Sequence, residues 1–261
     1  MKHIPNIFTL INLFFGCLAI VSALQLDVSF LYQLDGQPIM QNMQASLWMA
    51  SLFIGLAAIV DFLDGFLARL MKVSSEMGKQ LDSLSDVVSF GVAPAIILYQ
   101  ILRMAILKDS EALETPMTWA YAAFLVACFA AWRLAKFNID TRQQYGFRGV
   151  PTPAVGLLVA SFPLILYYNY FDGAVNDLLL NRWVIFAIVI LLCYLMVMDR
   201  PILSLKFKDF SLRNNILKII LLVVAVVAAL TLKWLAVPAV FVVYIILSLA
   251  TARSQIVNPK S

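Results

Sequence analysis

Charged residues are scarce in this chain of 261 residues, where they make up 13% of the sequence. An average soluble domain has about 25%. Hydrophobic residues reach 62%, and the mean hydropathy is +0.90. This composition excludes an ordinary water-soluble domain, and it predicts a polytopic membrane protein whose apolar surface faces lipid.

Histidine and cysteine, which supply many metal and redox sites, are nearly absent. His3 is the only histidine, and the three cysteines Cys17, Cys128 and Cys193 stand singly inside apolar runs. No C-x-x-C spacing is present, so zinc binding and thiol redox chemistry are not expected. No basic run with interleaved aromatic residues indicates a nucleic-acid surface either.

Long apolar runs are abundant, and each of about 20 residues is long enough to cross a bilayer as a helix. The first run lacks a cleavage site followed by a soluble domain, so we expect it to be retained as a span rather than removed as a signal peptide. The predicted fold is all-α, a polytopic helical bundle of about eight transmembrane helices. The expected spans are 5–24, 46–70, 87–107, 117–135, 153–171, 182–198, 215–231 and 234–251.

Lysine and arginine indicate the orientation of these spans. If Met1 is cytoplasmic, 15 of the 19 basic residues fall on the cytoplasmic side. The other side then holds only Arg103, Lys108, Arg182 and Lys233. The positive-inside rule therefore predicts a multi-pass protein of the bacterial inner-membrane type with both termini in the cytoplasm. The net charge of +4 indicates attraction to anionic headgroups and phosphates.

The chain shows no low-complexity linker and no internal repeat, which predicts a single membrane domain over 1–261. Within it we expect a six-span catalytic core, 1–198, and two added C-terminal spans, 216–251. The segment 199–215 is basic with interspersed apolar residues. It is interpreted either as an interfacial stretch on the cytoplasmic leaflet or as a solvated loop.

Four carboxylates occur beside the apolar runs, where an ionised acid is costly unless a cation or a water-filled cavity holds it. The segment Asp61–Asp86 reads DFLDGFLARLMKVSSEMGKQLDSLSD, which is D-x2-D-G-x2-A-R-x8-G-x3-D-x3-D. Eight fixed identities at set gaps make this a far more specific signal than a short glycine motif. The four acids are Asp61, Asp64, Asp82 and Asp86.

Helical spacing predicts that these acids share one site. Asp61 and Asp64 fall on one stripe of a helix together with Gly65 and Ala68, with Arg69 at its edge. The spacing i, i+4, i+8 aligns the remaining positions of the pattern on one face of a second helix in the same way. These positions are Gly78, Asp82 and Asp86.

The eight residues LMKVSSEM between the two halves are enough for a short connection. Ser74 or Ser75 is expected to cap the second helix. Two antiparallel helices would then bring the four carboxylates together at the cytoplasmic membrane surface.

Clustered carboxylates repel one another unless divalent cations neutralise them. Oxygen ligands without histidine or cysteine favour Mg²⁺, Mn²⁺ or Ca²⁺. A pair of such ions suits pyrophosphate chemistry, and a further carboxylate can take a proton from an attacking hydroxyl. Gly65 permits close approach of a flat group, and Arg69 offers a forked phosphate donor. A divalent-cation transporter is the remote alternative, although its acids should lie near the bilayer midplane.

The full pattern resembles the signature of the CDP-alcohol phosphatidyltransferases, integral membrane enzymes of phospholipid synthesis. The resemblance implies that Asp61, Asp64 and Asp82 are metal ligands for Mg²⁺ or Mn²⁺, and that Asp86 is both a ligand and the general base. It also implies that the cytidine diphosphate (CDP) moiety contacts three further positions. These are Gly65, Arg69 and Gly78.

The opening stretch IPNIFTLINLFFG places Asn6, Thr9 and Asn12 three residues apart at the cytoplasmic mouth of the first span. These residues are interpreted either as a helix cap with interhelical hydrogen bonds or, by the resemblance, as part of the nucleotide site. We expect Asn6 and Thr9 to bind CDP.

Three further stretches narrow the family. LDSLSDVVSFGVAPA carries a helix that we expect to be broken by Gly91 and Pro94, and RLAKFN is followed by FRGVPTPA. Over roughly residues 4 to 155 the chain is similar to the integral membrane phosphatidylserine synthases. This resemblance implies transfer of a phosphatidyl group from CDP-diacylglycerol to L-serine with release of CMP. It also implies that the protein forms a homodimer.

A basic pocket for the acceptor is expected next to the metals. A free amino acid has a carboxylate that needs a cationic partner, but glycerol 3-phosphate or an inositol phosphate would use the same charges. Each residue taken singly is equally well read as a snorkelling or positive-inside charge. The predicted pocket residues are Arg133, Lys136, Asn138 and Arg148.

Overall fold

The structure is a computed structural model, and it describes residues 4–25, 40–71, 75–109, 114–139, 147–168, 173–202 and 212–257. The described chain is helical apart from one pair of two-residue strands. Its longer helices are α1 (Ile4–Leu24), α2 (Met40–Leu70), α3 (Glu76–Val87), α4 (Ala93–Lys108), α5 (Leu125–Ile139), α6 (Thr152–Tyr168), α8 (Arg182–Val197), α9 (Leu212–Leu232) and α10 (Ala236–Val257). The shorter elements are η2 (Val88–Val92), η3 (Met117–Phe124), β1 (Phe147–Arg148), α7 (Ala174–Leu179), β2 (Pro201–Ile202) and η6 (Lys233–Leu235).

The long helices match the predicted spans. Five described helical stretches are long and apolar enough to cross a membrane, and α6 and α8 are shorter apolar helices. The last stretch is interrupted by η6, so that α9 and α10 pack against each other as a hairpin. The chain is therefore a helical membrane protein, as its composition predicted.

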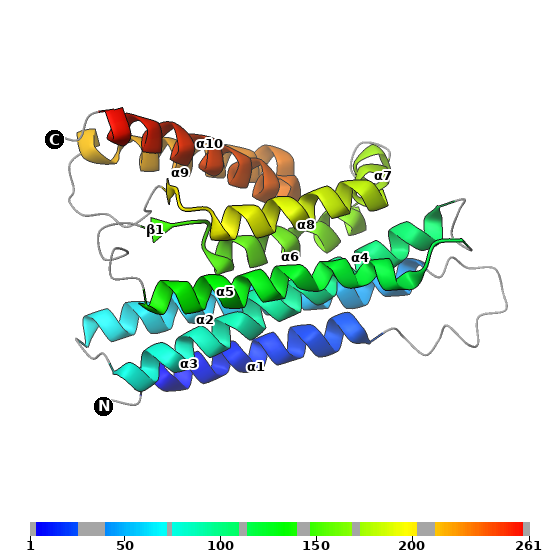
Figure 1. Cartoon of the computed structure of the whole chain (residues 1–261), viewed down its shortest axis with the longest axis horizontal. Coiled ribbons are helices and arrows are strands. Elements are labelled where there is room, and N and C mark those ends of the chain that lie inside the picture. The colour runs from blue at the N-terminus through cyan, green and yellow to red at the C-terminus, as the bar shows by residue number, and fades with distance from the viewer. Residues whose placement is uncertain are drawn as a thin grey trace.

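Figure 1 shows how the helices are arranged. α1 packs along α2, and α2 packs against α6. The hairpin of α9 and α10 lies on the opposite side of α6 and α8 from α1. α1 begins, α2 ends, α3 begins and α10 ends at one common end of the bundle.

The core of the bundle forms around η2 and α4. Phe90, Ile97 and Leu98 are completely buried, whereas the outer helices expose large apolar side chains such as Phe62 and Leu230. In water such exposure would be costly, but lipid tails cover it in a membrane. The helical stretch that begins with α3 therefore continues through η2 and α4 into the most enclosed part of the protein.

The expected break at Gly91 and Pro94 is wrong, because the chain remains helical through both residues. It changes to a π-helical turn over Val88–Val92 before α4 begins. Pro94 lies in the first turn of α4 and has no N–H to donate, and the wider turn before it accommodates that loss. A single distorted helix, 76–108, thus bears Asp82 near its start and the buried Asp86 one turn further along, before it enters the core.

The π-helical turn packs closely against α1. The Ser89 hydroxyl donates a 3.0 Å hydrogen bond to the Asn12 carbonyl oxygen. A Cβ atom added at Gly16 would lie 2.4 Å from the Ser89 Oγ and 2.9 Å from the Ser89 Cα. Only glycine at position 16 allows the two helices to approach this closely.

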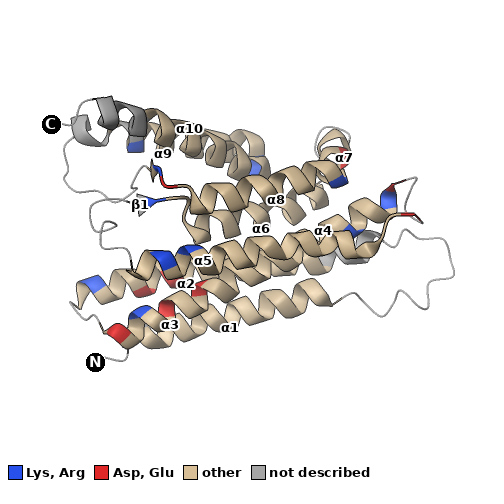
Figure 2. Cartoon of the chain, viewed as in Figure 1, with Lys and Arg blue, Asp and Glu red and all other residues tan. Residues whose placement is uncertain are grey.

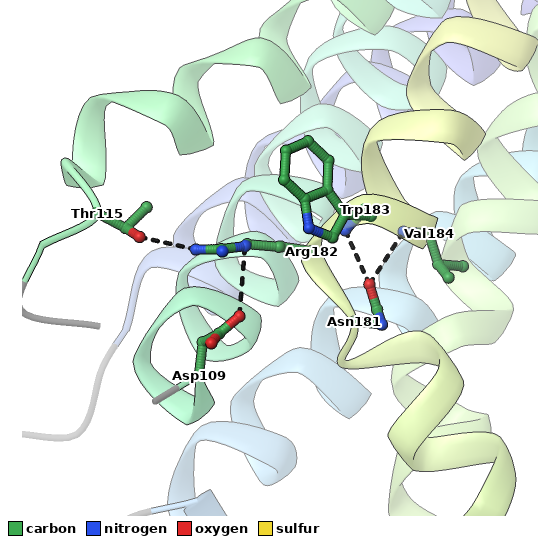
Figure 3. Close-up of polar contacts among 6 residues, drawn as sticks. All are labelled: Asp109, Thr115, Asn181, Arg182, Trp183 and Val184. Atoms are coloured by element: carbon green, nitrogen blue, oxygen red, sulfur yellow. Dashed lines mark hydrogen bonds and ion pairs between the residues drawn. The ribbon is translucent and has the colours of Figure 1, made fainter. Parts of the chain in front are cut away.

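At the end of the bundle away from the start of α1, Arg182 connects the start of α8 to the end of α4 (Figure 3). Its Nη1 donates a 2.7 Å hydrogen bond to the Thr115 hydroxyl, and its Nε forms an ion pair with Asp109 at 3.3 Å. Asn181 caps α8 by accepting a 2.9 Å hydrogen bond from the Trp183 amide. These contacts join the start of α8 to the end of α4 and to the residues that precede η3.

The strands β1 and β2 pair antiparallel, with Phe147 opposite Ile202 and Arg148 opposite Pro201. Most of the predicted basic segment 199–215 lies outside the described residues, so its interfacial position stays a prediction. Its first residues form β2, and its last residues begin α9.

Candidate active site

Three of the four aspartates form one compact cluster. Asp61 and Asp64 lie near the end of α2, and Asp82 lies on α3. One carboxylate oxygen from each of the three lies within 4.8 Å of the others. Figure 2 shows the acidic residues of α2 and α3 near the end of the bundle where α1 begins. The helical spacing in the sequence thus places these side chains together, as expected.

The fourth aspartate, Asp86, lies one turn deeper along α3 and is buried. Its carboxyl group lies against that of Asp61 and within electrostatic range of Asp64 and Asp82. Its Oδ1 atom is buried and has no hydrogen-bond partner among the residues that the structure describes. A buried carboxylate oxygen without a partner is unusual, and it is available for a bound cation or a substrate proton.

α1 contributes the residue that orients one of these acids. The Thr9 hydroxyl donates a 2.9 Å hydrogen bond to the Asp64 Oδ2, and both side chains are buried. The Ser85 hydroxyl, on α3, donates to the Thr9 carbonyl oxygen at 3.0 Å. Thr9 therefore links the two aspartate helices, and its hydroxyl faces the acidic cluster.

The start of α3 lies next to the start of α1. Ser75 is the N-cap of α3, and it accepts a 3.0 Å hydrogen bond from the Gly78 amide. This confirms the predicted serine cap at position 75, whereas Ser74 lies outside the described residues. A Cβ atom added at Gly78 would lie 3.2 Å from the Asn6 Oδ1. Asn6 and Gly78, both predicted to contact CDP, are thus direct neighbours.

Gly65 and Arg69 form the second predicted nucleotide pair. The Arg69 Nε donates a 2.8 Å hydrogen bond to the Gly65 carbonyl oxygen, one helical turn back. The Arg69 side chain is exposed. This contact holds the guanidinium beside Gly65, with donors left to face an anionic ligand.

Among the predicted acceptor residues, Arg133 is the one with a charge that interacts with an aspartate of the site. It is 7% exposed, and its charge lies within electrostatic range of Asp86. Its Nη1 reaches the Thr152 hydroxyl on α6 at 3.5 Å, and its Nε is buried without a hydrogen-bond partner in the described part of the chain. A buried guanidinium with a vacant donor is suited to binding an anion.

The other three residues of the predicted basic pocket differ in their surroundings. The Asn138 Nδ2 donates a 2.9 Å hydrogen bond to Ser83, which lies next to Asp82 on α3. Lys136 is half-buried on α5. Arg148 lies on β1 and forms a 2.8 Å ion pair with Asp199, so its charge is already matched by a neighbour.

The donor set of the cluster fits a hard divalent cation. It consists of carboxylate oxygens with a hydroxyl group behind one of them, and Mg²⁺ and Mn²⁺ prefer oxygen ligands of this kind. His3 lies outside the described residues. Three carboxylates this close together in a membrane protein need a positive charge to offset their repulsion.

Sequence reasoning missed several residues that complete the site. Ser83, Ser85 and Thr152 each form a hydrogen bond with a predicted site residue or its backbone. The only indication of them in the sequence is that these hydroxyl residues lie within or beside the stretches that resemble the family. Asn12 is also completely buried, and within the described ranges neither the nitrogen nor the oxygen of its amide group has a hydrogen-bond partner.

Comparison with known proteins agrees with this geometry. The family model described as CDP-alcohol phosphatidyltransferase matches residues 2–199. A CDP-diacylglycerol–serine O-phosphatidyltransferase from Helicobacter pylori is 32% identical over 221 residues, covering 84% of this chain and 79% of the relative. The Bacillus subtilis protein of the same name is 31% identical over 170 residues, covering 65% and 78%.

An archaeal relative carries a different name. The archaetidylserine synthase of Methanothermobacter thermautotrophicus is 33% identical over 138 residues, which cover 52% of this chain and 55% of the relative. The family match covers most of the chain, including every aspartate of the cluster. The chain belongs to the CDP-alcohol phosphatidyltransferase family.

Proposed function

We propose that the protein is a CDP-diacylglycerol:serine O-phosphatidyltransferase, which transfers a phosphatidyl group from CDP-diacylglycerol to L-serine. Phosphatidylserine and CMP are the products. The observation that carries the proposal is the meeting of Asp61, Asp64 and Asp82 beside the buried Asp86, in a chain with the complete family signature. The names of the bacterial relatives support serine as the acceptor.

The metal site in this proposal consists of Asp61, Asp64, Asp82 and Asp86. Two divalent ions, Mg²⁺ or Mn²⁺, would neutralise the pyrophosphate of the donor and the charge that develops at phosphorus when they are bound. Thr9 holds the Asp64 carboxylate in place through its 2.9 Å hydrogen bond. Such outer contacts commonly orient metal ligands.

The donor nucleotide is held at the start of α1, the end of α2 and the start of α3. Gly65 leaves room for a flat group, because only the Arg69 Nη2, at 4.0 Å, would lie near an added Cβ atom, and Asn6 lies directly beside Gly78. Arg69 donates to phosphate oxygens from its position beside Gly65. Thr9 belongs to the same pocket, because its hydroxyl donates a hydrogen bond to the Asp64 carboxylate.

The acceptor is held between α5 and α3. Arg133 binds the carboxylate of L-serine, because its guanidinium is buried and its Nε has no partner among the described residues. Asn138 and Lys136 extend this pocket along α5, and Arg148 lies at its outer edge, where it pairs with Asp199. Arg133 lies within electrostatic range of Asp86, so the bound serine is near the general base.

Asp86 takes the proton of the serine hydroxyl as its oxygen attacks the phosphorus attached to diacylglycerol. A new P–O bond to serine forms, and the bond from that phosphorus to the bridging oxygen breaks. The bridging oxygen leaves with CMP. Direct in-line transfer is preferred to a covalent intermediate because His3 is the only histidine in the sequence, and a phosphatidyl group trapped on Asp86 would overturn it.

The wider setting of the site is part of the same proposal. The end of the bundle with the aspartates faces the cytoplasm of a cell membrane, and both termini lie on that side, because most basic residues then satisfy the positive-inside rule. The chain forms a single domain with a six-span core over 1–198, a basic interfacial segment over 199–215 and two C-terminal spans over 216–251. The working unit is a homodimer.

CMP release by the purified protein tests the function. The protein receives CDP-diacylglycerol and Mg²⁺ or Mn²⁺ with L-serine, glycerol 3-phosphate or inositol phosphate supplied separately. We expect release with L-serine, and a loss of at least about 100-fold in Asp86→Asn, since removing a general base has this effect. Glu76→Gln, at an exposed position on α3, is the matched control. Release with another alcohol replaces serine as the acceptor, and release with none rejects the proposal.

A further inference from the structure

The acidic cluster draws its carboxylates from two helices, α2 and α3, and α1 packs against both of them. Within the described residues, each of these contacts with α1 is far more extensive than any direct contact between α2 and α3. α1 and α3 begin at the same end of the bundle and run side by side (Figure 1). The distance between the acids of α2 and those of α3 therefore depends on how α1 is held between the two helices.

Two serines connect α3 and the π-helical turn η2 to backbone carbonyl groups of α1. The Ser85 hydroxyl donates a 3.0 Å hydrogen bond to the Thr9 carbonyl oxygen, and the Ser89 hydroxyl donates a 3.0 Å hydrogen bond to the Asn12 carbonyl oxygen. Ser85 is 1% exposed and Ser89 is completely buried. A hydroxyl enclosed in a membrane protein is costly without a polar partner, so these bonds fix the position of α1 along α3 and η2.

The two bonds differ in what the side chain of the α1 residue contacts. The Thr9 hydroxyl donates a 2.9 Å hydrogen bond to the Asp64 Oδ2. The Asn12 amide group has no hydrogen-bond partner among the described residues. Ser85 is therefore connected through Thr9 to an acid of the cluster, whereas Ser89 has no such connection through Asn12.

Buried residues from three helices form the connection to the cluster. Ser85, Thr9 and Asp64 are all buried, and both hydrogen bonds between them have ordinary lengths. Ser85 directly precedes Asp86 and follows Asp82 by three residues. The turn of α3 that bears its two acids thus also holds Thr9, and a shift of α1 away from α3 would move the Thr9 hydroxyl relative to Asp64.

We propose that Ser85 is a positioning residue of the metal site, which fixes Thr9, and through it the Asp64 carboxylate, at the distance from the acids of α3 that a divalent ion requires. The inference rests on the function proposed above, in which these acids hold Mg²⁺ or Mn²⁺. Ser85 acts through the backbone of Thr9 and is not itself a ligand.

Binding of Mn²⁺ to the purified full-length protein tests this role without relying on activity. Free Mn²⁺ is followed by electron paramagnetic resonance during a titration with the metal alone. Ser85→Ala should raise the Kd for Mn²⁺ about fivefold, as for the loss of one hydrogen bond of ordinary strength. Ser89→Ala is the matched control, because it removes a bond of the same kind and length to the same helix, and it should leave the Kd unchanged. An equal rise in both variants, or no rise in Ser85→Ala, would overturn the inference.

The melting temperature separates positioning from loss of stability. Without metal, both alanine variants should lower it by similar amounts, because each loses one buried hydrogen bond. Only Ser85→Ala should reduce the rise in melting temperature that Mn²⁺ causes. Ser85→Cys, which has a side chain of similar shape but is a weak donor, replaces Ser85→Ala if the alanine variant does not fold.

A double variant tests whether Ser85 acts through Thr9. Thr9→Val removes the hydroxyl that holds Asp64, so the position of the Thr9 backbone should then no longer affect that carboxylate. The protein with both Thr9→Val and Ser85→Ala should bind Mn²⁺ no more weakly than Thr9→Val alone, because the two residues form one unit. Effects that multiply would contradict the connection.

The wild-type protein distinguishes failure of the inference from failure of the function. If wild type binds Mn²⁺ and releases CMP with L-serine, but Ser85→Ala binds Mn²⁺ equally well, only the inference fails. If wild type binds Mn²⁺ and uses a different acceptor, the serine assignment fails, and the Mn²⁺ comparison still decides the inference. A wild-type protein that binds no Mn²⁺ rejects both the metal site and the inference.

Discussion

The Thr9 hydroxyl on α1 donates a 2.9 Å hydrogen bond to the Asp64 carboxylate on α2, and both residues are buried. The two residues are 55 positions apart in the chain. The contact orients the Asp64 carboxylate, which also contributes an oxygen to the acidic cluster. The position of α1 therefore helps to determine the shape of the site.

Replacing Thr9 by valine should weaken metal binding while leaving the fold intact. Valine has the shape of threonine but cannot donate to Asp64, and loss of such an outer contact typically lowers metal affinity about 10- to 100-fold. The concentration of Mn²⁺ needed for half-maximal CMP release should rise accordingly. Thr231→Val is the control, since Thr231 bonds only to carbonyl groups of its own helix among the contacts described. Equal metal requirements in wild type and Thr9→Val would contradict this role.

Removal of divalent ions should abolish activity reversibly. Chelation with EDTA leaves the carboxylates of Asp61, Asp64 and Asp82 without a neutralising charge. Added Mg²⁺ or Mn²⁺ should restore CMP release, because both ions favour oxygen ligands. The measurement is a metal titration of the chelated protein. Full activity after exhaustive chelation would mean that the cluster serves another purpose.

Replacing Gly16 by alanine should lower stability. The new methyl group would lie 2.4 Å from the Ser89 Oγ and 2.9 Å from its Cα, so α1 and the π-helical turn must separate. Overpacking of this kind costs about 1 to 3 kcal/mol. The melting temperature in detergent should fall clearly below that of wild type. Gly55→Ala is the matched control, because an added Cβ there has no neighbour within 4 Å. Equal melting temperatures for both variants would argue against the close approach.

Replacing Arg182 by alanine should destabilise the end of the bundle far from the aspartates. The side chains of Arg182 and Asp109 are 10% and 30% exposed, and breaking a largely buried ion pair costs roughly 3 kcal/mol. The pair between Lys108 and Asp177 is more exposed, at 41% and 72%, and is worth at most about 1 kcal/mol. Thermal unfolding should therefore show a larger shift for Arg182→Ala than for Lys108→Ala. A reversed order would show that burial does not decide the contribution of these pairs.

Local spacing was enough to predict the acidic cluster. Asp61 and Asp64 are three residues apart, and Asp82 and Asp86 are four apart, so each pair shares a helix face whatever the rest of the fold does. The short connection with its cap at Ser75 then brings the two helices back to the same end of the bundle. The shape of the helix between residues 87 and 94 could not be predicted in the same way. Gly91 and Pro94 are equally compatible with a break and with a π-helical turn, and packing against α1 accompanies the turn.

The predicted basic pocket shows the limit of such reasoning. Sequence patterns placed Arg133, Lys136, Asn138 and Arg148 in one group because they follow one another along the chain. In the structure, Arg133 lies near Asp86, Asn138 bonds Ser83, and Arg148 pairs with Asp199. Which side chain reaches which partner depends on the packing of α5, α3 and the strand pair, which no local pattern records.

The sequence by itself determined that this is a helical membrane protein with an acidic site, because hydropathy and helical periodicity act over short distances and do not depend on the final packing. Tertiary structure alone decided that Thr9 meets Asp64, that Gly16 meets Ser89, and that Asn138 bonds Ser83. These contacts join helices far apart in the chain. They form only when the whole bundle closes, since side-chain partners across helices are selected by shape and burial rather than by spacing.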